Sequence, residues 1–428
     1  MGGALLYKRS MILRLFNAGL RLGSLGVKMI LTLYMGRYLG LDQFGTYGLV
    51  AASVAIAIPL MGLRTDYSIT RELVTSSGVD LAAKMRDQAV FYGLNYIIVA
   101  LGVVVLLWGV PGAVDYHVGI YALLLSILES LATMTSTNLV SLRRPVLANV
   151  LFFVCSAAWA IPVMVIGFFQ PEWRTAQAVF IFWSAGVLAS LAVTAWFWRD
   201  IPWLEAFRRP VDWKWVKSHV RMSFFIWLGA VGAAAAGNAD RFVVDHFLGR
   251  EFVGISSFYG SFVVAISSLL YSGIFAFGFP QLVNHYRERN DAAFRHEAWR
   301  LTLHASVSGG ILALIIGVIV PQLGGFLGRQ EFEDQAFTLW LILFGIWLRS
   351  VTESIYYVMY ARHQDRPIWI GNLLQLLVAL VSGVLLVASL GFEGVGYSAI
   401  ATSVFIGLWR LYFLKRGIPP RPDTGGEI

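Results

Sequence analysis

The chain has 428 residues, of which 57% are hydrophobic and only 14% are charged, and its mean hydropathy is +0.68. A soluble domain keeps about a quarter of its residues charged, so this composition excludes an ordinary water-soluble protein and indicates an integral membrane protein. At roughly 20 apolar residues per membrane helix, about 12 helices would use a little over half of the chain. Little length then remains for soluble domains.

Apolar stretches predict twelve membrane helices separated by short loops. The first follows Lys8 and Arg9 and runs on to Tyr38, which is longer than the apolar part of a cleaved signal peptide. In chain order the predicted helices cover residues 11–35, 44–65, 89–109, 118–141, 146–169, 176–198, 220–246, 253–279, 301–321, 335–359, 367–389 and 394–414.

The sequence has no motif of a common enzyme class. Its single cysteine, Cys155, excludes a disulfide framework and a cysteine-based zinc site. It lies in the apolar run LFFVCSAAWA, which favours a packed core thiol. The seven histidines lack HExxH spacing, and GxSxG, GxxxxGK[ST] and GxGxxG are absent. We therefore expect no catalytic residues, no metal site and no cofactor.

The basic residues are distributed unequally between the two sides of the predicted membrane region. With these twelve helices, 22 of the 33 lysines and arginines lie on one side, and only Arg37, Arg174, Arg250 and Arg329 lie on the other. The positive-inside rule then predicts that both termini are cytoplasmic. The net charge of +8 is explained by this topology and gives no indication of nucleic-acid binding.

The two halves of the chain share a pattern. GRYLGLDQFGTYGL at 36–49 and DHFLGREFVGISSF at 245–258 both contain aromatic-Leu-Gly-x-acidic-x-x-Gly, with an offset of 209 residues. This repeat predicts an all-α membrane protein with two pseudo-symmetric six-helix bundles around a central cavity, which is a transporter architecture. The predicted parts are an N-terminal bundle (1–198), a cytoplasmic amphipathic linker (199–219), a C-terminal bundle (220–414) and a cytoplasmic tail (415–428).

The remaining seven basic residues lie within or at the ends of apolar helices. An Arg or Lys at the bilayer centre costs about 2.5–3.5 kcal/mol even on the lenient insertion scale, so such residues usually face a hydrated cavity or a partner. They are the most informative positions for function: Arg14, Arg21, Lys28, Arg64, Arg241, Arg349 and Arg410.

Three of these cations share one face of the first helix. Arg14, Arg21 and Lys28 are spaced by seven residues, with Asn17 and Ser24 between them. We predict that Arg21 and Lys28 form a cationic cavity wall. The alternative is a set of structural ion pairs with acidic residues of neighbouring helices. Arg14 is near the cytoplasmic end and could equally extend toward the lipid headgroups.

Other charged positions allow two interpretations each. Arg349 and Glu353 are i and i+4 on one helix, so they could pair within it or serve function. Arg64 and Arg410 lie near cytoplasmic helix ends, where extension toward the headgroups is the default. The adjacent Asp240 and Arg241 point about 100° apart, so we expect one of them to face the cavity.

The lone carboxylate Glu129 lies in the middle of a predicted helix. It is a candidate proton or cation site, or else the partner of a cation on the first helix. Together with Asp240 and Glu353 it makes up the candidate ion-coupling set, for which the coupling ion would be H⁺ or Na⁺. No other cofactor is expected.

Several runs together resemble a known family. RYLGLDQFGTYGL at 37–49, GLRTDYSITRE at 62–72 and NADRFVVDHFLGREFVG at 238–254 resemble the polysaccharide-flippase (Wzx-type) branch of the multidrug/oligosaccharidyl-lipid/polysaccharide (MOP) exporter superfamily. The resemblance runs through both halves. Two departures matter: the chain lacks the extra helix pair that lipid II flippases carry, and Arg64 stands where a small or neutral residue is usual.

The resemblance implies a flippase of the bacterial inner membrane. Its expected substrate is an undecaprenyl-pyrophosphate-linked oligosaccharide, such as an O-antigen, capsule or exopolysaccharide repeat unit, moved from the cytoplasmic to the periplasmic leaflet by alternating access. The candidate partners are the lipid bilayer, a polysaccharide polymerase and a chain-length regulator. Asp240 matches a carboxylate that the family often carries. The candidate substrate-binding residues are Arg21, Lys28, Arg14, Arg64 and Arg349.

Two other functions compete with this one. A multidrug or cation antiporter of the same fold would favour an acidic cavity, whereas basic residues predominate here. A membrane-embedded polysaccharide polymerase or ligase would need a sizeable periplasmic loop, and the longest predicted outer loop is only about 322–334.

Overall fold

The computed structural model describes the backbone of residues 2–109 and 116–416, and the side chains of those residues except 2–15, 18 and 67. All regular structure in these ranges is helical. Eleven helical segments are long and apolar enough to cross a membrane, and they coincide with the second to twelfth predicted helices. The prediction of an all-α, multi-pass membrane protein is confirmed.

The first predicted span corresponds to α1 (Gly2–Tyr38), whose 37 residues also exceed the length of a bilayer crossing. It is not among the eleven apolar segments, because the polar stripe of Arg21, Ser24 and Lys28 lowers its hydropathy. The most polar of the long helices is therefore the one predicted to line a cavity.

Contacts between residues divide the chain into two units, Met1–Trp227 and Leu228–Ile428. The division falls inside α10 (Trp213–Ala236), so the predicted linker at 199–219 packs as part of the first unit. Trp203 and Trp215 of this linker pack against a buried cluster of Ile69, Leu73 and Met85, so these two rings lie against protein.

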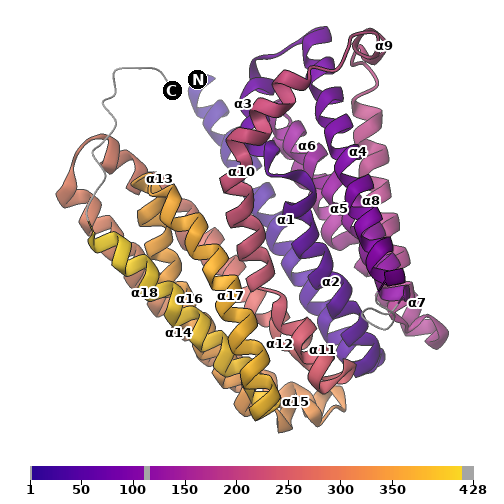
Figure 1. The fold of residues 1–428 in the computed structure, drawn as a ribbon, viewed down its shortest axis with the longest axis vertical. Helices are drawn as coiled ribbons and strands as arrows, with labels where there is room; N and C mark the ends of the chain where they lie inside the picture. The colour runs from indigo at the N-terminus through magenta and orange to yellow at the C-terminus, as the bar shows by residue number, and fades with distance from the viewer. Residues whose placement is uncertain (1, 110–115, 417–428) are drawn as a thin grey trace. The chain divides into compact units, whose positions relative to one another are not determined.

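The first unit is a bundle of long helices with the short α9 at one end (Figure 1). Within it, α5 is central, because it contacts α2, α3, α4, α6 and α8. After α1, its elements are α2 (Leu41–Gly62), α3 (Thr65–Thr75), α4 (Gly78–Gly109), α5 (Tyr116–Ser141), α6 (Pro145–Phe153), the π-helical turn η1 (Val154–Ala158), α7 (Ala160–Phe169), the 3₁₀ turn η2 (Pro171–Trp173), α8 (Ala176–Phe197) and α9 (Trp203–Phe207).

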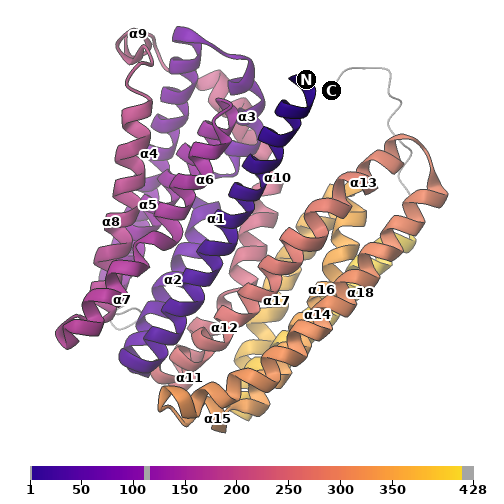
Figure 2. The same ribbon diagram turned by 180° about the vertical axis from the view of Figure 1, so that it is seen from behind.

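In the second unit, α16 packs against both α14 and α18, and α18 also packs against α17 (Figure 2). Its elements after α10 are α11 (Ala239–Leu248), α12 (Arg250–Leu270), the π-helical turn η3 (Tyr271–Phe275), α13 (Ala276–Arg287), α14 (Asp291–Leu327), α15 (Glu331–Asp334), α16 (Ala336–Ala361), α17 (Asp365–Leu390) and α18 (Glu393–Lys415).

Two predicted helices are interrupted for identifiable reasons. Pro162 cannot donate a hydrogen bond to the carbonyl of Ala158, and the π-helical turn η1 ends at that residue. The predicted helix 220–246 is split at Gly237 and Asn238, between α10 and α11. A mid-helix π-helical turn often marks a functional site, and η1 supplies two residues of the site described below.

Small residues bring α10 close to α17. A Cβ added at Gly229 would lie 2.9 Å from the Cβ of Trp369, and one added at Gly232 would lie 2.9 Å from the carbonyl oxygen of Asn372. The Asn372 side chain donates a hydrogen bond of 3.2 Å to the Gly229 carbonyl. The glycines in the GAVGAAAAG run therefore serve close helix packing.

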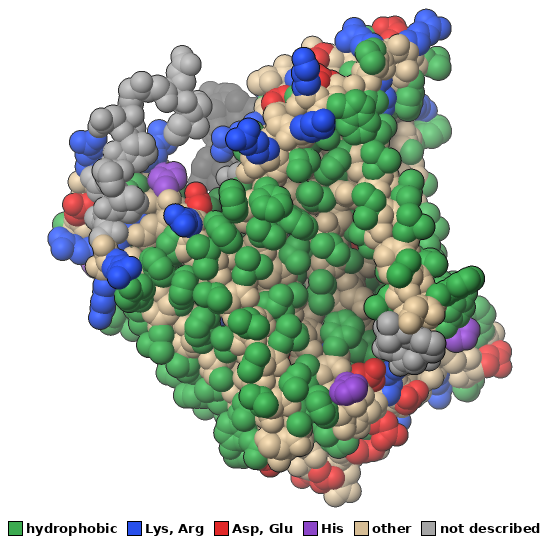
Figure 3. Space-filling model, in the orientation of Figure 1, with side chains coloured by type: hydrophobic (Ala, Val, Ile, Leu, Met, Phe, Trp, Pro, Cys, Tyr) green, Lys and Arg blue, Asp and Glu red, His purple; other side chains and the backbone are tan. Residues whose placement is uncertain are grey.

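The exterior matches a bilayer environment. On the face shown in Figure 3, hydrophobic side chains cover the middle of the helices, and lysines and arginines gather around α3 and α9. Large apolar side chains such as Val105, Leu188 and Leu314 are more than half exposed. Apolar surface of this extent is stable in contact with lipid.

Candidate substrate and ion sites

In the polar stripe of α1, the two cationic side chains are exposed and the serine between them is buried. Arg21 and Lys28 are exposed, and neither forms an ion pair with a described residue. Ser24 between them is buried and donates to the carbonyl of Leu20 at 2.9 Å. The side chain of Arg14 lies outside the described residues. The stripe therefore presents two side-chain cations, one helical heptad apart.

Glu129 of α5 is the centre of a polar cluster in the first unit. Its carboxylate accepts hydrogen bonds from Trp183 Nε1 at 2.6 Å and from Cys155 Sγ at 3.4 Å. The Lys28 ammonium also interacts electrostatically with this carboxylate, although the two form no direct ion pair. Cys155 is a buried free thiol, as predicted. The cluster brings together residues of α1, α5, η1 and α8.

An aromatic ring packs against this cluster, and two unpaired polar atoms lie on neighbouring residues of the chain. Trp159 stacks on Trp183, with ring centroids 5.6 Å apart and an interplanar angle of 9°. Trp159 Nε1 and Ser156 Oγ are buried and have no hydrogen-bond partner within the part of the chain that the structure describes. Burial of such atoms is costly. In this region the Glu129 carboxylate is the group that can take up a proton or a cation, because the indole N–H of Trp159 can only donate.

In the second unit Arg349 and Glu353 do not pair within their helix, which was one of the two interpretations of their spacing. Glu353 is instead 3.2 Å from Arg410 Nη1, and the same nitrogen donates to the carbonyl of Thr352 at 2.8 Å. Arg410 is only 6% exposed, so the expectation that it extends toward the headgroups is wrong. Arg410 reaches Glu353 because α18 packs against α16. The i, i+4 spacing used in the sequence analysis describes pairs within one helix only, so it could not predict this contact between helices.

Arg349 is consequently a third cation without an ion pair among the described residues. Its Nη1 lies 3.9 Å from the position that a Cβ on Gly237 would take, so the guanidinium lies beside the break between α10 and α11. Partial exposure leaves it open to a ligand.

Asp240 and Arg241 have different neighbours, as their spacing predicts. Asp240 accepts a hydrogen bond from Ser256 at 3.1 Å. Arg241 donates to Asn238 at 2.8 Å, and its Nη2 lies 2.7 Å from the position of a Cβ on Gly260. The glycine therefore makes room for the guanidinium of Arg241.

Arg64 lies at a tight junction between helices. It and Leu63 adopt left-handed backbone conformations, with φ of 53° and 44°, between α2 and α3. Its Nε atom is buried and has no hydrogen-bond partner in the described ranges. An open carboxylate or phosphate acceptor would satisfy it.

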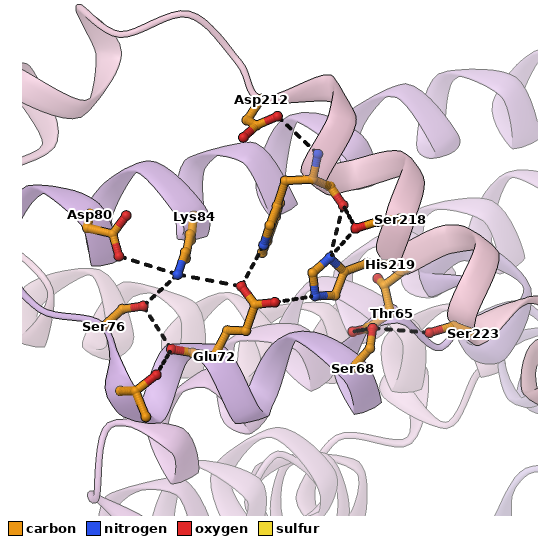
Figure 4. A network of polar contacts seen from close by, with 12 residues as sticks. Thr65, Ser68, Glu72, Ser76, Asp80, Lys84, Asp212, Ser218, His219 and Ser223 are labelled. Carbon is orange, nitrogen blue, oxygen red and sulfur yellow. Dashed lines mark hydrogen bonds and ion pairs between the residues drawn. The ribbon is translucent and has the colours of Figure 1, made fainter. Parts of the chain in front are cut away.

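Sequence reasoning missed a network that joins α3, α4 and α10 at one end of the first unit (Figure 4). Glu72 accepts from Trp215 Nε1 at 2.7 Å and lies 3.1 Å from His219 Nε2 and 3.5 Å from Lys84 Nζ. His219 is 2% exposed. Nothing in the sequence marks it, because its partner is 147 positions away.

A second missed pair ties the linker to α4. The buried Arg86 and Asp87 form an ion pair of 2.5 Å, and Arg86 also donates to the carbonyls of Ala206, Arg209 and Pro210. Asp87 accepts from the backbone N–H of Asp212 at 3.1 Å. Each polar group of the pair therefore has a partner, which burial requires.

Solved membrane transporters share this arrangement of helices. An inward-facing multidrug-resistance MATE family transporter of the MOP superfamily superimposes with a TM-score of 0.74, over 93% of this chain and 98% of its own, at 12% identity. The chain has the MOP transporter fold. The lipid II flippase MurJ, in an inward closed conformation, has a TM-score of 0.72 over 95% and 88% of the two chains, at 12% identity.

A third neighbour shares this MOP fold. The MATE multidrug transporter DinF-BH has a TM-score of 0.64 at 12% identity, over 94% of this chain and 95% of its own. No protein-family model and no curated protein matches the sequence. The neighbours therefore confirm the predicted MOP fold, and they include both multidrug transporters and a lipid II flippase.

Proposed function

We propose that the protein is a transporter that flips an undecaprenyl-pyrophosphate-linked oligosaccharide across the inner membrane by alternating access, with both termini in the cytoplasm. A pyrophosphate and its sugars cannot cross hydrocarbon, so the protein has to supply fixed positive charge in place of water. Support comes from the fold, which this chain shares with a lipid II flippase.

The observation that carries the proposal is an asymmetry between in-helix acids and bases. Glu353 and Asp245 have arginine partners within 3.2 Å and 2.7 Å, Glu129 accepts two hydrogen bonds, and Asp240 accepts one from Ser256. By contrast, Arg21, Lys28 and Arg349 form no ion pair with a described residue. Lys28 interacts with Glu129 electrostatically but without direct contact. Cations that lack an ion pair within membrane helices suit an anionic substrate.

The second candidate is a multidrug or cation antiporter. It is favoured by the MATE neighbours and by Asp240, whose carboxylate has a serine hydroxyl but no ion pair among the described residues. In either case Glu129, Asp240 and Glu353 are the carboxylates available for H⁺ or Na⁺ coupling. Glu353 is the least suited of the three, because Arg410 neutralises it.

The test uses cells that lack their own flippase for a defined surface glycan and express this protein. We expect that Arg21→Ala or Lys28→Ala abolishes surface glycan while the protein still accumulates in the membrane fraction. Lys217→Ala is the control, because Lys217 is an exposed cation outside the predicted membrane span. Normal glycan in both stripe variants would refute the cavity assignment.

A transport assay separates the two candidates. In proteoliposomes, the antiporter hypothesis predicts uptake of a cationic dye that Asp240→Asn abolishes. The flippase hypothesis predicts no dye uptake, together with accessibility of an undecaprenyl-pyrophosphate glycan to a lectin on the opposite leaflet. Dye uptake without glycan translocation would replace the first candidate with the second.

A further inference from the structure

A cavity in the first unit lies away from the residues discussed so far. Its volume is about 430 Å³, and it opens between the first turn of α6 and the last turn of α8. Residues 198–202 connect α8 to α9, which lies at one end of the first unit (Figure 1). The lining side chains are Arg144, Leu147, Trp196, Phe197, Arg199 and Asp200. Leu147 also packs against the buried cluster of Leu139, Ala148 and Leu151, so the apolar wall of the cavity is fixed to the core.

Two guanidinium groups of this cavity lie against two consecutive aromatic residues. Arg144 Cζ is 5.7 Å from the ring centroid of Phe197, and Arg199 Cζ is 4.2 Å from that of Trp196. A guanidinium stacked on a ring keeps its edge N–H groups free to donate to phosphate oxygens. Arg144 has no ion pair within the described ranges, so its donors are available.

The cavity also contains one carboxylate. Asp200 is 3.6 Å from Arg199 and its side chain is 88% exposed, so it holds Arg199 only weakly. Two cations and one anion around one opening complement a ligand that carries a phosphate together with an ammonium group.

Apolar surface continues from the cavity along both helices. Trp196 is 65% exposed, and farther along α8 Val193 and Leu188 are 40% and 52% exposed. On α6, Phe152 is 48% exposed. The cavity therefore lies at the end of a lipid-facing strip, at the level where tryptophans and arginines of membrane proteins meet the headgroups.

We propose that this cavity binds the headgroup of a phospholipid that carries a primary amine, such as phosphatidylethanolamine. The phosphate lies between Arg144 and Arg199, the ammonium lies at Asp200, and the acyl chains run along the exposed strip of α6 and α8. The uncapped N–H groups at the start of α6 add favourable partial positive charge. This site does not depend on which substrate the transporter moves.

The test is native mass spectrometry of the full-length protein in detergent, with added phosphatidylethanolamine, phosphatidylglycerol or diacylglycerol. Wild type should retain phosphatidylethanolamine in preference to the other two. The Arg144→Gln/Arg199→Gln variant should lose at least about tenfold in affinity, which corresponds to about 1.4 kcal/mol. The matched control is Arg208→Gln/Lys217→Gln, which removes two exposed cations outside the cavity and should bind as wild type does.

Asp200→Asn provides a second test of the same site. This variant should reduce binding of phosphatidylethanolamine to the level of phosphatidylglycerol, because only the amine lipid uses the carboxylate. Equal phosphatidylethanolamine binding by the two double variants would overturn the site. A wild-type preference for phosphatidylglycerol would overturn the amine contact. Displacement of the lipid by millimolar inorganic phosphate would show a free-phosphate site instead.

Discussion

Two arginines of the second unit show how the surroundings of a residue decide its role. Arg410 is buried and bonded to both Glu353 and the Thr352 carbonyl. Arg349 is partly exposed beside Gly237 and has no ion pair in the described part of the chain. The same side-chain chemistry thus serves stability at one position and remains available for an anion at the other.

This difference predicts opposite effects of matched substitutions. Arg410→Met should lower the free energy of unfolding by about 1–3 kcal/mol, since it removes the buried arginine that donates to both Glu353 and the Thr352 carbonyl. Arg349→Met should leave stability almost unchanged but reduce transport. Thermal unfolding in detergent and the glycan-export assay measure the two effects. An equally large loss of stability in Arg349→Met would contradict the assignment.

At the residue scale, helix spacing predicts which side chains share a face, but it does not predict their partners on other helices, and the cavity role of Arg21 and Lys28 stays a prediction. The spacing of Arg21 and Lys28 placed both on one face of α1, and both are exposed. The partner of Glu353 could not be predicted, because it depends on how α18 is rotated against α16. Glu129 allowed two interpretations from sequence, and the structure shows hydrogen bonds from Trp183 and Cys155 with Lys28 nearby.

At the scale of elements, α10 packs closely against α17 and is then separated from α11 by a break in the helix. Its glycines allow contact with α17 at backbone distance, and it ends at Ala236 before α11 restarts. Composition and apolar periodicity predicted every long helix, because about 20 apolar residues are needed to cross a bilayer. They did not predict the α10–α11 break or η1, whose positions depend on tertiary contacts and on a single proline.

The close approach of α10 to α17 can be tested with two glycine substitutions. Gly232→Ala should destabilise the protein by about 1–3 kcal/mol, because the new Cβ would lie 2.9 Å from the Asn372 carbonyl oxygen. Gly102→Ala in α4 is the control, since nothing lies within 4 Å of its Cβ position. It should be neutral or stabilising by about 0.5–1 kcal/mol. Similar unfolding midpoints for the two variants would argue against the close contact.

At the scale of the whole molecule, the distribution of charge predicts an orientation. Most lysines and arginines lie on one side of the predicted spans, and within the first unit they gather around α3 and α9 (Figure 3). Fold and orientation are separate properties. The fold is confirmed by structural neighbours, whereas the cytoplasmic position of the termini stays a prediction.

Cysteine labelling in cells tests that orientation. After Cys155→Ser removes the native thiol, Ser218→Cys should react only with reagents that reach the cytoplasm. Glu172→Cys, in the exposed turn η2 at the opposite end of α8 from Arg199, should react with a membrane-impermeant maleimide added outside. Labelling of Ser218→Cys by the impermeant reagent would invert the topology.

The ion pair of Arg86 and Asp87 has a consequence for biosynthesis. Arg86 and Asp87 are synthesised early. The residues whose carbonyls accept hydrogen bonds from Arg86, namely Ala206, Arg209 and Pro210, are translated about 120 residues later. A nascent chain shorter than 210 residues therefore carries a charged pair without its full set of acceptors. The pair therefore gains its full set of acceptors only near the end of synthesis of the first unit, before the second unit, which begins at Leu228, is translated.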